Sequence, residues 1–291
     1  MGDISFLGLG DMGFAIANSA MRAGYDTVVW NRTKDRANPL VEYGAVLASS
    51  SAEAISKSPV IVVCVSDYKV AETFLQTPDA IAALNGRILV QLSSGSPKQA
   101  RAAESWVHQA GASYLDGEIL AYVEQIGTPE SLFLVSGDNN AYSQCEKLLK
   151  ILAPQTRYLG LDPARAAALT LGFHSGSLGL ITGILNGAAI CEAEGVSMSE
   201  FGDLIPLLMG YDAEALSESV KRIEAGGLDN SDASIGVWAA ITKTIIETAN
   251  ETGYEPAFPE FIQNLFNRAI DNGLGEHDVG ALINVFRPKS R

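Results

Sequence analysis

The chain has 291 residues, of which 47% are hydrophobic and 19% are charged, and its formal net charge is -14. These values predict a folded protein of about two domains and exclude a disordered chain or a protein with many membrane spans. The negative charge disfavours nucleic acid and anionic membranes as partners. Three cysteines without a Cys-x-x-Cys pair argue against a metal site, and reduced thiols with no targeting segment indicate a cytoplasmic protein.

The first predicted elements are a strand at residues 4–9, a helix at 12–23 and a second strand at 26–30. A glycine-rich loop joins the first strand to the helix, as in dinucleotide-binding proteins. Gly8 permits a tight turn, Gly10 lets the backbone approach a pyrophosphate, and Gly13 lets the helix pack closely on the strand. The residues expected to bind the dinucleotide here are Gly8, Leu9, Gly10, Asp11, Met12 and Gly13.

Basic and polar residues follow the second strand. NAD sites usually have a carboxylate there for the ribose 2′-hydroxyl, but this strand ends in Asn31, Arg32 and Thr33. Arg32 can pair with a 2′-phosphate, Asn31 and Thr33 can donate hydrogen bonds, and Lys34 or Arg36 can add charge. The pattern therefore favours NADP(H), and its alternative is a solvated basic turn without a ligand.

Further strands at residues 60–65, 87–92, 113–116, 131–136 and 156–159 alternate with predicted helices. This order predicts an α/β fold with a doubly wound sheet of the Rossmann type. Ligands of such sheets lie at the carboxyl ends of the strands, so Cys64, Val65, Ser66 and Ser94 are expected beside the cofactor. Cys64 is expected to be a wall residue and not a nucleophile, because no basic residue is near it in sequence.

The second half begins with 26 residues between Arg165 and Glu192 that include no Asp, Glu, Lys or Arg. Their length fits a transmembrane helix, but His174, Asn186 and several hydroxyl side chains interrupt them, so we expect a helix buried on all sides. Glycines recur in it at spacings of three and four, which suits close helix packing in a dimer. These glycines are Gly172, Gly176, Gly179, Gly183 and Gly187.

Shorter helices are predicted at residues 201–208, 213–225, 234–250, 259–272 and 278–286. The expected organisation is an NADP-binding Rossmann domain at 1–162, a long interdomain helix at 163–195 and an all-α dimerisation and substrate domain at 196–291. A helical domain of this size cannot easily bury its apolar faces alone. We therefore expect a domain-swapped homodimer in which the long helices are exchanged.

Several motifs fall in the order and at the spacing found in one family. They are GLGDMG at 8–13, VVWNRT at 28–33, LSSGSP at 92–97, YLDGEILAYVEQIG at 114–127, YLGLDP at 158–163 and IPLLMGY at 205–211. Through them the chain resembles imine reductases, within the β-hydroxyacid dehydrogenase superfamily, nearly from end to end. The resemblance implies NADPH dependence, a C-terminal domain like that of 6-phosphogluconate dehydrogenase, and an active site between the Rossmann domain of one subunit and the helical domain of the other.

The resemblance also assigns catalytic positions. Hydroxyacid dehydrogenases of the superfamily have a lysine on the connecting helix and imine reductases tend to have Asp or Tyr, but the matching residue here is Thr170. A threonine hydroxyl cannot act as an acid near neutral pH, which disfavours alcohol oxidation. Either Tyr211 or His174 replaces the donor, or the substrate arrives as an iminium ion, which we slightly prefer. The implied substrate pocket comprises Ser94, Tyr122, Leu178 and Trp238.

The function expected is NADPH-dependent hydride transfer to the C=N bond of a small imine or preformed iminium ion, cyclic and from specialised metabolism. One alternative is an oxidoreductase acting on C=O or CH–OH groups, like the β-hydroxyacid dehydrogenases, and another is an NADP-binding protein without turnover. Simpler interpretations also exist: His174 as a buried structural residue, Tyr211 and Trp238 as core aromatics, and Glu118 and Tyr122 as residues that only shape a loop.

Overall fold

The computed structural model describes residues 2–229 and 233–288. Its contacts divide the chain into two compact units, Met1–Ser175 and Gly176–Arg291. The boundary falls inside the longest helix, α8 (Ala164–Ala193). The three-part division at 1–162, 163–195 and 196–291 stays a prediction.

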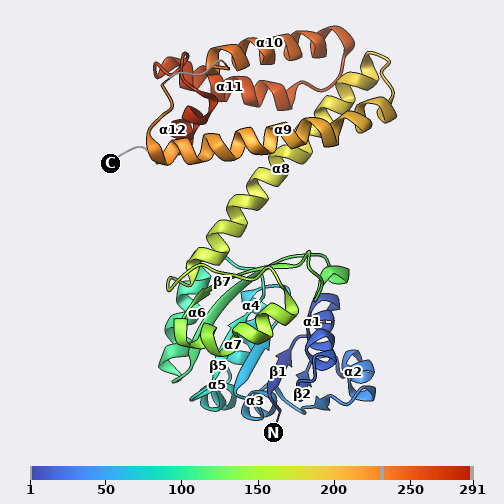
Figure 1. Ribbon diagram of the computed structural model, residues 1–291, viewed down its shortest axis with the longest axis vertical. Coiled ribbons are helices and arrows are strands. Elements are labelled where there is room, and N and C mark those ends of the chain that lie inside the picture. Colours follow the sequence, from blue (N-terminus) through green and yellow to red (C-terminus); the bar gives the residue numbers. More distant parts are fainter. Residues whose placement is uncertain (1, 230–232, 289–291) are drawn as a thin grey trace. The chain divides into compact units, whose positions relative to one another are not determined.

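The first unit contains one eight-stranded sheet in the order β3-β2-β1-β4-β5-β6-β7-β8 (Figure 1). Neighbouring strands from β3 to β6 are parallel, β7 is antiparallel to β6, and β8 is parallel to β7. The predicted Rossmann-type sheet is therefore confirmed. The strands are β1 (Ile4–Leu7), β2 (Thr27–Trp30), β3 (Val46–Leu47), β4 (Val60–Val63), β5 (Ile88–Gln91), β6 (Ser113–Leu120), β7 (Leu132–Gly137) and β8 (Arg157–Tyr158).

Helices cover both faces of this sheet, because successive strand residues point to opposite sides. One apolar cluster joins alternate strand residues to α1 and α7, and the other joins the intervening residues to α3, α4, α5 and α6. The helices are α1 (Asp11–Arg22), α2 (Asn38–Glu42), α3 (Ser51–Ser56), α4 (Tyr68–Leu75), α5 (Pro78–Leu84), α6 (Pro97–Gln109) and α7 (Asn139–Leu152), with 3-10 turns η1 (Lys34–Ala37) and η2 (Val123–Gln125).

The second unit is helical. It contains α9 (Met198–Ala225), α10 (Ile235–Thr252), α11 (Ala257–Asp271), η3 (Val279–Leu282), α12 (Ile283–Phe286) and the second part of α8. Its small core includes Ile235 and Phe266. A polar contact fastens η3 to α9: Asp278 accepts hydrogen bonds from Ser219 and Arg222, each at 2.8 Å.

Helix α9 corrects one prediction. The sequence suggested separate helices at 201–208 and 213–225, but the structure has one continuous helix that contains Pro206. A proline inside a helix removes one backbone hydrogen bond, here to the carbonyl group of Gly202. Gly202 is exposed, so water can satisfy that carbonyl and the helix continues.

Helix α8 is exposed in the single chain, so the expectation of a helix buried on all sides is wrong for one copy. Only 6% of its most apolar window is buried, and by length and composition it is apolar enough to cross a membrane. A Cβ added at Gly172, Gly176 or Gly179 would meet no atom within 4 Å. The large apolar side chains exposed along it are Leu169, Leu171, Phe173, Leu178, Leu180, Ile181 and Leu185.

Candidate active site

The loop after β1 has the shape of a pyrophosphate cradle. Gly8 has φ +98°, and a Cβ added there would lie 2.2 Å from the carbonyl oxygen of Cys64. A Cβ on Gly13 would lie 2.2 Å from the carbonyl oxygen of Gly8, whereas a Cβ on Gly10 would meet nothing within 4 Å. No side chain caps the N-terminus of α1 at Gly10, so its first amide groups remain available to an anion.

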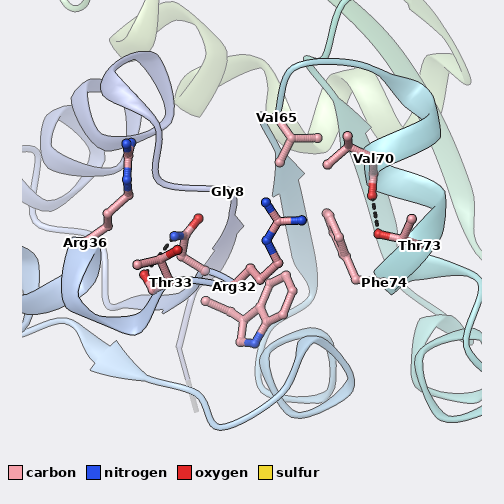
Figure 2. A pocket seen from close by; sticks show the side chains of 10 residues that line it. Gly8, Arg32, Thr33, Arg36, Val65, Val70, Thr73 and Phe74 are labelled. Carbon is pink, nitrogen blue, oxygen red and sulfur yellow. Dashed lines mark hydrogen bonds between the residues drawn. The ribbon is translucent and has the colours of Figure 1, made fainter.

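A pocket of about 450 Å³ opens beside this loop, at the end of β2. Figure 2 shows the Arg32 guanidinium group directed into it, between the polar side chain of Thr33 and the apolar side chains of Val65, Val70 and Phe74. Arg32 is exposed, and none of the hydrogen bonds or ion pairs found among the described residues involves its side chain. A cationic group without a partner at the rim of a pocket suits a phosphate ligand.

The neighbouring residues hold the two loops together. The Asn31 side chain accepts a hydrogen bond from the Leu9 backbone at 2.9 Å and donates one to the Thr33 carbonyl at 2.8 Å. Arg36 also lines the pocket, but its guanidinium group points away from Arg32 and donates to the Leu9 carbonyl at 3.4 Å (Figure 2). The sequence interpretation missed the opposite wall of the pocket, which comes from α4 and includes Val70, Thr73 and Phe74.

The loops after β4 and β5 lie together at the same edge of the sheet. The Ser93 hydroxyl accepts a hydrogen bond from the Val65 backbone at 3.0 Å, and Ser66 and Ser94 are exposed. Burial raises the pKa of the Cys64 thiol to about 12, so the thiolate is not available near neutral pH. This supports the interpretation of Cys64 as a wall residue.

A buried acidic cluster follows the same edge and was not predicted as a site. Asp116 on β6 accepts hydrogen bonds from Tyr68 of α4 and from Tyr114, and the two tyrosine oxygens are 2.8 Å apart. The remaining carboxylate oxygen, Oδ2, has no hydrogen bond within 3.5 Å among the described residues, but the Ala167 backbone amide of α8 is near enough to favour the charged form of Asp116. Burial raises the pKa of Asp116 to about 7, although the hydrogen bonds from both tyrosines favour its charged form.

Glu118 lies two residues farther along the same face of β6 and is only 8% exposed. Burial, with a smaller contribution from the charge of Asp116, raises the pKa of its carboxyl group to about 8. The sequence did contain a signal for this pair, because carboxylates alternate in Asp116-Gly117-Glu118 at the end of a predicted strand. Their burial is a tertiary property that the pattern does not reveal.

The catalytic candidates from the connecting helix have different surroundings. Thr170 is 4% exposed, and its hydroxyl group has no hydrogen-bond partner among the described residues. His174 is exposed, with its ring centroid 5.9 Å from that of Phe173, so it is not a buried structural residue in the single chain. Tyr211 belongs to α9, but its side chain lies outside the described part of the chain.

The predicted substrate-pocket residues are distributed over both units. Ser94 and Tyr122 belong to the first unit, where Tyr122 is 74% exposed, and Leu178 and Trp238 belong to the second, where they are 64% and 41% exposed. Trp238 is thus not a core aromatic residue in the single chain. Assembly of these residues into one pocket stays a prediction.

Comparison with known families covers almost the whole chain. Residues 3–160 match the NAD binding domain of 6-phosphogluconate dehydrogenase, and residues 162–288 match the C-terminal domain described as NADPH-dependent reductive aminase-like. The NADPH-dependent reductive aminase of Aspergillus oryzae is 33% identical, over 98% of this chain and 97% of the relative.

Solved structures agree. An imine reductase from Myxococcus stipitatus in complex with NADP+ matches with a TM-score of 0.91 and 30% identity, over 98% of this chain and all of that one (100%). A reductive aminase from Aspergillus terreus in complex with NADPH and ethyl-5-oxohexanoate matches with a TM-score of 0.89 and 31% identity, over 99% and 100% of the two chains.

The Rossmann sheet and its glycine-rich loop define a dinucleotide-dependent oxidoreductase. Within that class, the chain belongs to the family of NADPH-dependent reductive aminases and imine reductases. It is therefore an NADPH-dependent enzyme that reduces C=N bonds, which confirms the cofactor and the reaction class expected from the sequence.

Proposed function

We propose that the substrate is a cyclic imine or iminium ion, which the enzyme reduces to the corresponding amine. The observation that carries this proposal is the chemistry of α8 around Thr170. No Lys, Asp, Glu or Arg lies between Arg165 and Glu192, and a threonine hydroxyl cannot take a proton from an alcohol near neutral pH. Apart from His174, one turn beyond Thr170, this stretch of the helix therefore offers no base for alcohol oxidation, whereas a C=N carbon with positive charge on its nitrogen accepts a hydride without one.

The cofactor residues fit NADPH. We assign the pyrophosphate to Gly10 and the N-terminus of α1, because no side chain caps that helix end. We assign the 2′-phosphate to Arg32 with Asn31 and Thr33, because all three line the pocket and the Asn31 amide, which donates one hydrogen bond to the Thr33 carbonyl, has a second N–H to offer. When bound, NADPH supplies the hydride equivalent that reduces the substrate carbon. The contribution of the chain is to hold the reactants in position, which by itself can lower a barrier by several kcal/mol.

Steady-state assays test this proposal. With NADPH, the purified chain is expected to reduce a five- or six-membered cyclic imine at a higher kcat/KM than any small aldehyde or ketone. With NADP+, it is expected to oxidise small 3-hydroxy acids negligibly. Robust hydroxyacid oxidation would favour a hydroxyacid dehydrogenase instead, and NADPH binding without turnover of any of these compounds would favour a cofactor-binding protein.

We also propose that the exposed face of α8 is covered by a second copy of this chain. The exposed apolar side chains continue onto α9 at Leu204, Leu207 and Leu216, each more than half exposed. This face is larger than monomeric proteins usually leave open and suits the interface of an obligate dimer. Unoccupied space at Gly176 and Gly179 would let the backbone of a second helix approach closely.

The oligomeric state tests the dimer. Wild-type protein is expected to have the mass of a dimer by light scattering without detergent, and Ile181→Glu is expected to be monomeric because it places a charge on the apolar face. Tyr43→Glu is the matched control, since Tyr43 is 78% exposed on the first unit and should leave the dimer intact. A monomeric wild type would contradict the proposal, and a requirement for detergent would indicate a membrane instead.

We also propose that the protein is located in the cytoplasm. All three cysteines, Cys64, Cys145 and Cys191, are free thiols, as is usual in a reducing compartment.

A further inference from the structure

The carboxyl half of β6 extends past its neighbour in the sheet. β5 pairs with β6 only from Ile88–Ser113 to Gln91–Asp116, so Gly117 and Glu118 lie beyond the end of β5. A Cβ added at Gly117 would lie 2.5 Å from the Leu92 side chain, which places this half of β6 against the loop that follows β5. Glu118 therefore lies at the edge of the sheet that also carries the nucleotide loop.

Other contacts fix the face on which Glu118 lies. Tyr114, Asp116 and Glu118 alternate along β6 and share one face. Tyr68, at the start of α4, donates a hydrogen bond to Asp116. The Tyr68 ring also lies against Gly95, because a Cβ added to Gly95 would be 2.3 Å from a ring carbon of Tyr68. The acidic cluster of Asp116 and Glu118 thus borders the loop that contains Ser94, one of the predicted substrate-pocket residues.

Glu118 differs from Asp116 in its partners. Asp116 accepts two tyrosine hydroxyl groups, but none of the hydrogen bonds or ion pairs found among the described residues involves the Glu118 carboxyl group. A carboxyl group that is largely shielded from water and has no protein donor is costly to ionise, so it is held in the protonated form more than an exposed glutamate is. A buried and unpaired acid at the reaction edge of the sheet is a source of one proton.

We propose that Glu118 is the acid that protonates the substrate nitrogen during C=N reduction, and that Asp116, Tyr68 and Tyr114 are positioning residues that keep Glu118 protonated. This inference rests on the imine or iminium substrate proposed above. In the step, the carbon gains the hydride that bound NADPH would supply, the π bond between carbon and nitrogen breaks, the Glu118 O–H bond breaks, and an N–H bond forms at nitrogen. The product is an amine, and the Glu118 carboxylate regains its proton from water.

The surroundings of Glu118 support storage of a proton at neutral pH. Its pKa of about 8 arises from burial first and from the charge of Asp116 second. Opposite it on β7 is Leu134, and β5 ends at Gln91, neither of which titrates. The only ionisable residue of α8 before His174 is Arg165, which is exposed. Tyr68 and Tyr114, which contact Asp116, have raised pKa values because they are buried, so both stay neutral.

Two substrates separate this role from a structural one. A cyclic imine whose conjugate acid is scarce at neutral pH needs a proton from the enzyme, whereas an N-alkyl cyclic iminium ion needs none. In Glu118→Gln, kcat for the imine is expected to fall about 100-fold or more, within the range for general acid catalysis, and kcat for the iminium ion to stay within about threefold. Glu124→Gln, at an exposed glutamate of η2, is the matched control and should change neither rate.

The pH dependence gives a second kinetic test. For wild type and the imine, kcat/KM is expected to fall above about pH 8, where Glu118 loses its proton. This decrease of kcat/KM at high pH should be absent when the substrate is the iminium ion, and also absent in the Glu118→Gln variant. Glu118→Asp, which retains an acid, is expected to recover part of the imine rate.

A measurement without turnover tests the proton itself. Protonated carboxyl groups are expected to give an infrared band in wild-type protein at pH 7, and the part of this band that comes from Glu118 should be lost in Glu118→Gln, while a contribution from Asp116 remains. The pKa of Glu118 is about 8 in the folded protein, whereas an ordinary glutamate has a pKa of 4.5. Between these two pH values the folded state binds more protons than the unfolded state, so the free energy of unfolding decreases as the pH rises. The urea midpoint should therefore decrease from pH 6 to pH 9 more steeply in wild type than in Glu118→Gln.

The outcomes are distinct. If Glu118→Gln lowered kcat equally for both substrates, or did not lower kcat for the imine, the role of Glu118 would be overturned and C=N reduction would be left intact. Failure of wild-type protein to reduce either substrate would instead overturn the proposed function. If Glu118→Gln did not fold, the wild-type pH profiles on the two substrates would decide, and identical profiles would refute the inference.

Discussion

Replacing Arg32 by alanine is expected to raise the Kd of NADPH about 10- to 100-fold, the usual loss for one hydrogen-bonded charge pair. The Kd of NADH should change less than about threefold, because NADH lacks the 2′-phosphate. The physical reason is that Arg32 projects into the pocket and its guanidinium group pairs with none of the residues that the structure describes (Figure 2). Fluorescence titration of both nucleotides measures the two constants.

Lys34→Ala is the control for Arg32. Lys34 is exposed in the same basic stretch but does not line the pocket, so it alters the local charge without removing the proposed partner. It should weaken NADPH binding only slightly, and less at high salt. Equal losses of NADPH and NADH affinity in Arg32→Ala would contradict the assignment of the 2′-phosphate to this residue.

Alanine at Gly13 and alanine at Gly10 are expected to fail in different ways. At Gly13 the new Cβ would lie 2.2 Å from the Gly8 carbonyl oxygen, and this backbone overlap should lower the free energy of unfolding by about 3 kcal/mol. At Gly10 the Cβ would meet no protein atom within 4 Å, so stability should change by about 1 kcal/mol or less. The Gly10 methyl group should instead obstruct the pyrophosphate and weaken NADPH binding at least about tenfold.

Urea unfolding followed by tryptophan fluorescence checks the first difference, since Trp30 and Trp106 both report on the first unit. Nucleotide titration checks the second. If Gly10→Ala bound NADPH as tightly as wild type, the cradle would have to lie elsewhere.

Local signals predicted the backbone of the candidate nucleotide loop and the coenzyme, whereas the contacts of single residues with the nucleotide stay a prediction. A glycine pattern between a strand and a helix specifies the backbone of the Gly8–Gly13 loop, and the polar residues after Trp30 follow directly from the end of β2. The opposite wall was missed because Val70 and Phe74 reach the pocket from another βα unit, where sequence periodicity indicates only a helix.

The acidic cluster depends on contacts between distant residues, and the sequence could not reveal it. Tyr68 and Asp116 are 48 positions apart, and the parallel order of β4, β5 and β6 lets the Tyr68 side chain at the start of α4 reach Asp116. Helix α8 shows a related limit. Its apolar composition correctly predicted a long helix, but composition does not say whether the same chain or another molecule covers it.

Helix α4 reaches both functional parts of the first unit. Its first residue, Tyr68, bonds to Asp116, and Val70, Thr73 and Phe74 line the pocket beside Arg32. We expect the eight residues of α4 to move together, so a displacement caused by a nucleotide bound as proposed would also move the Tyr68 hydroxyl group. We therefore expect occupancy by the coenzyme to influence the acidity of the Asp116 and Glu118 carboxyl groups through about two helical turns of backbone.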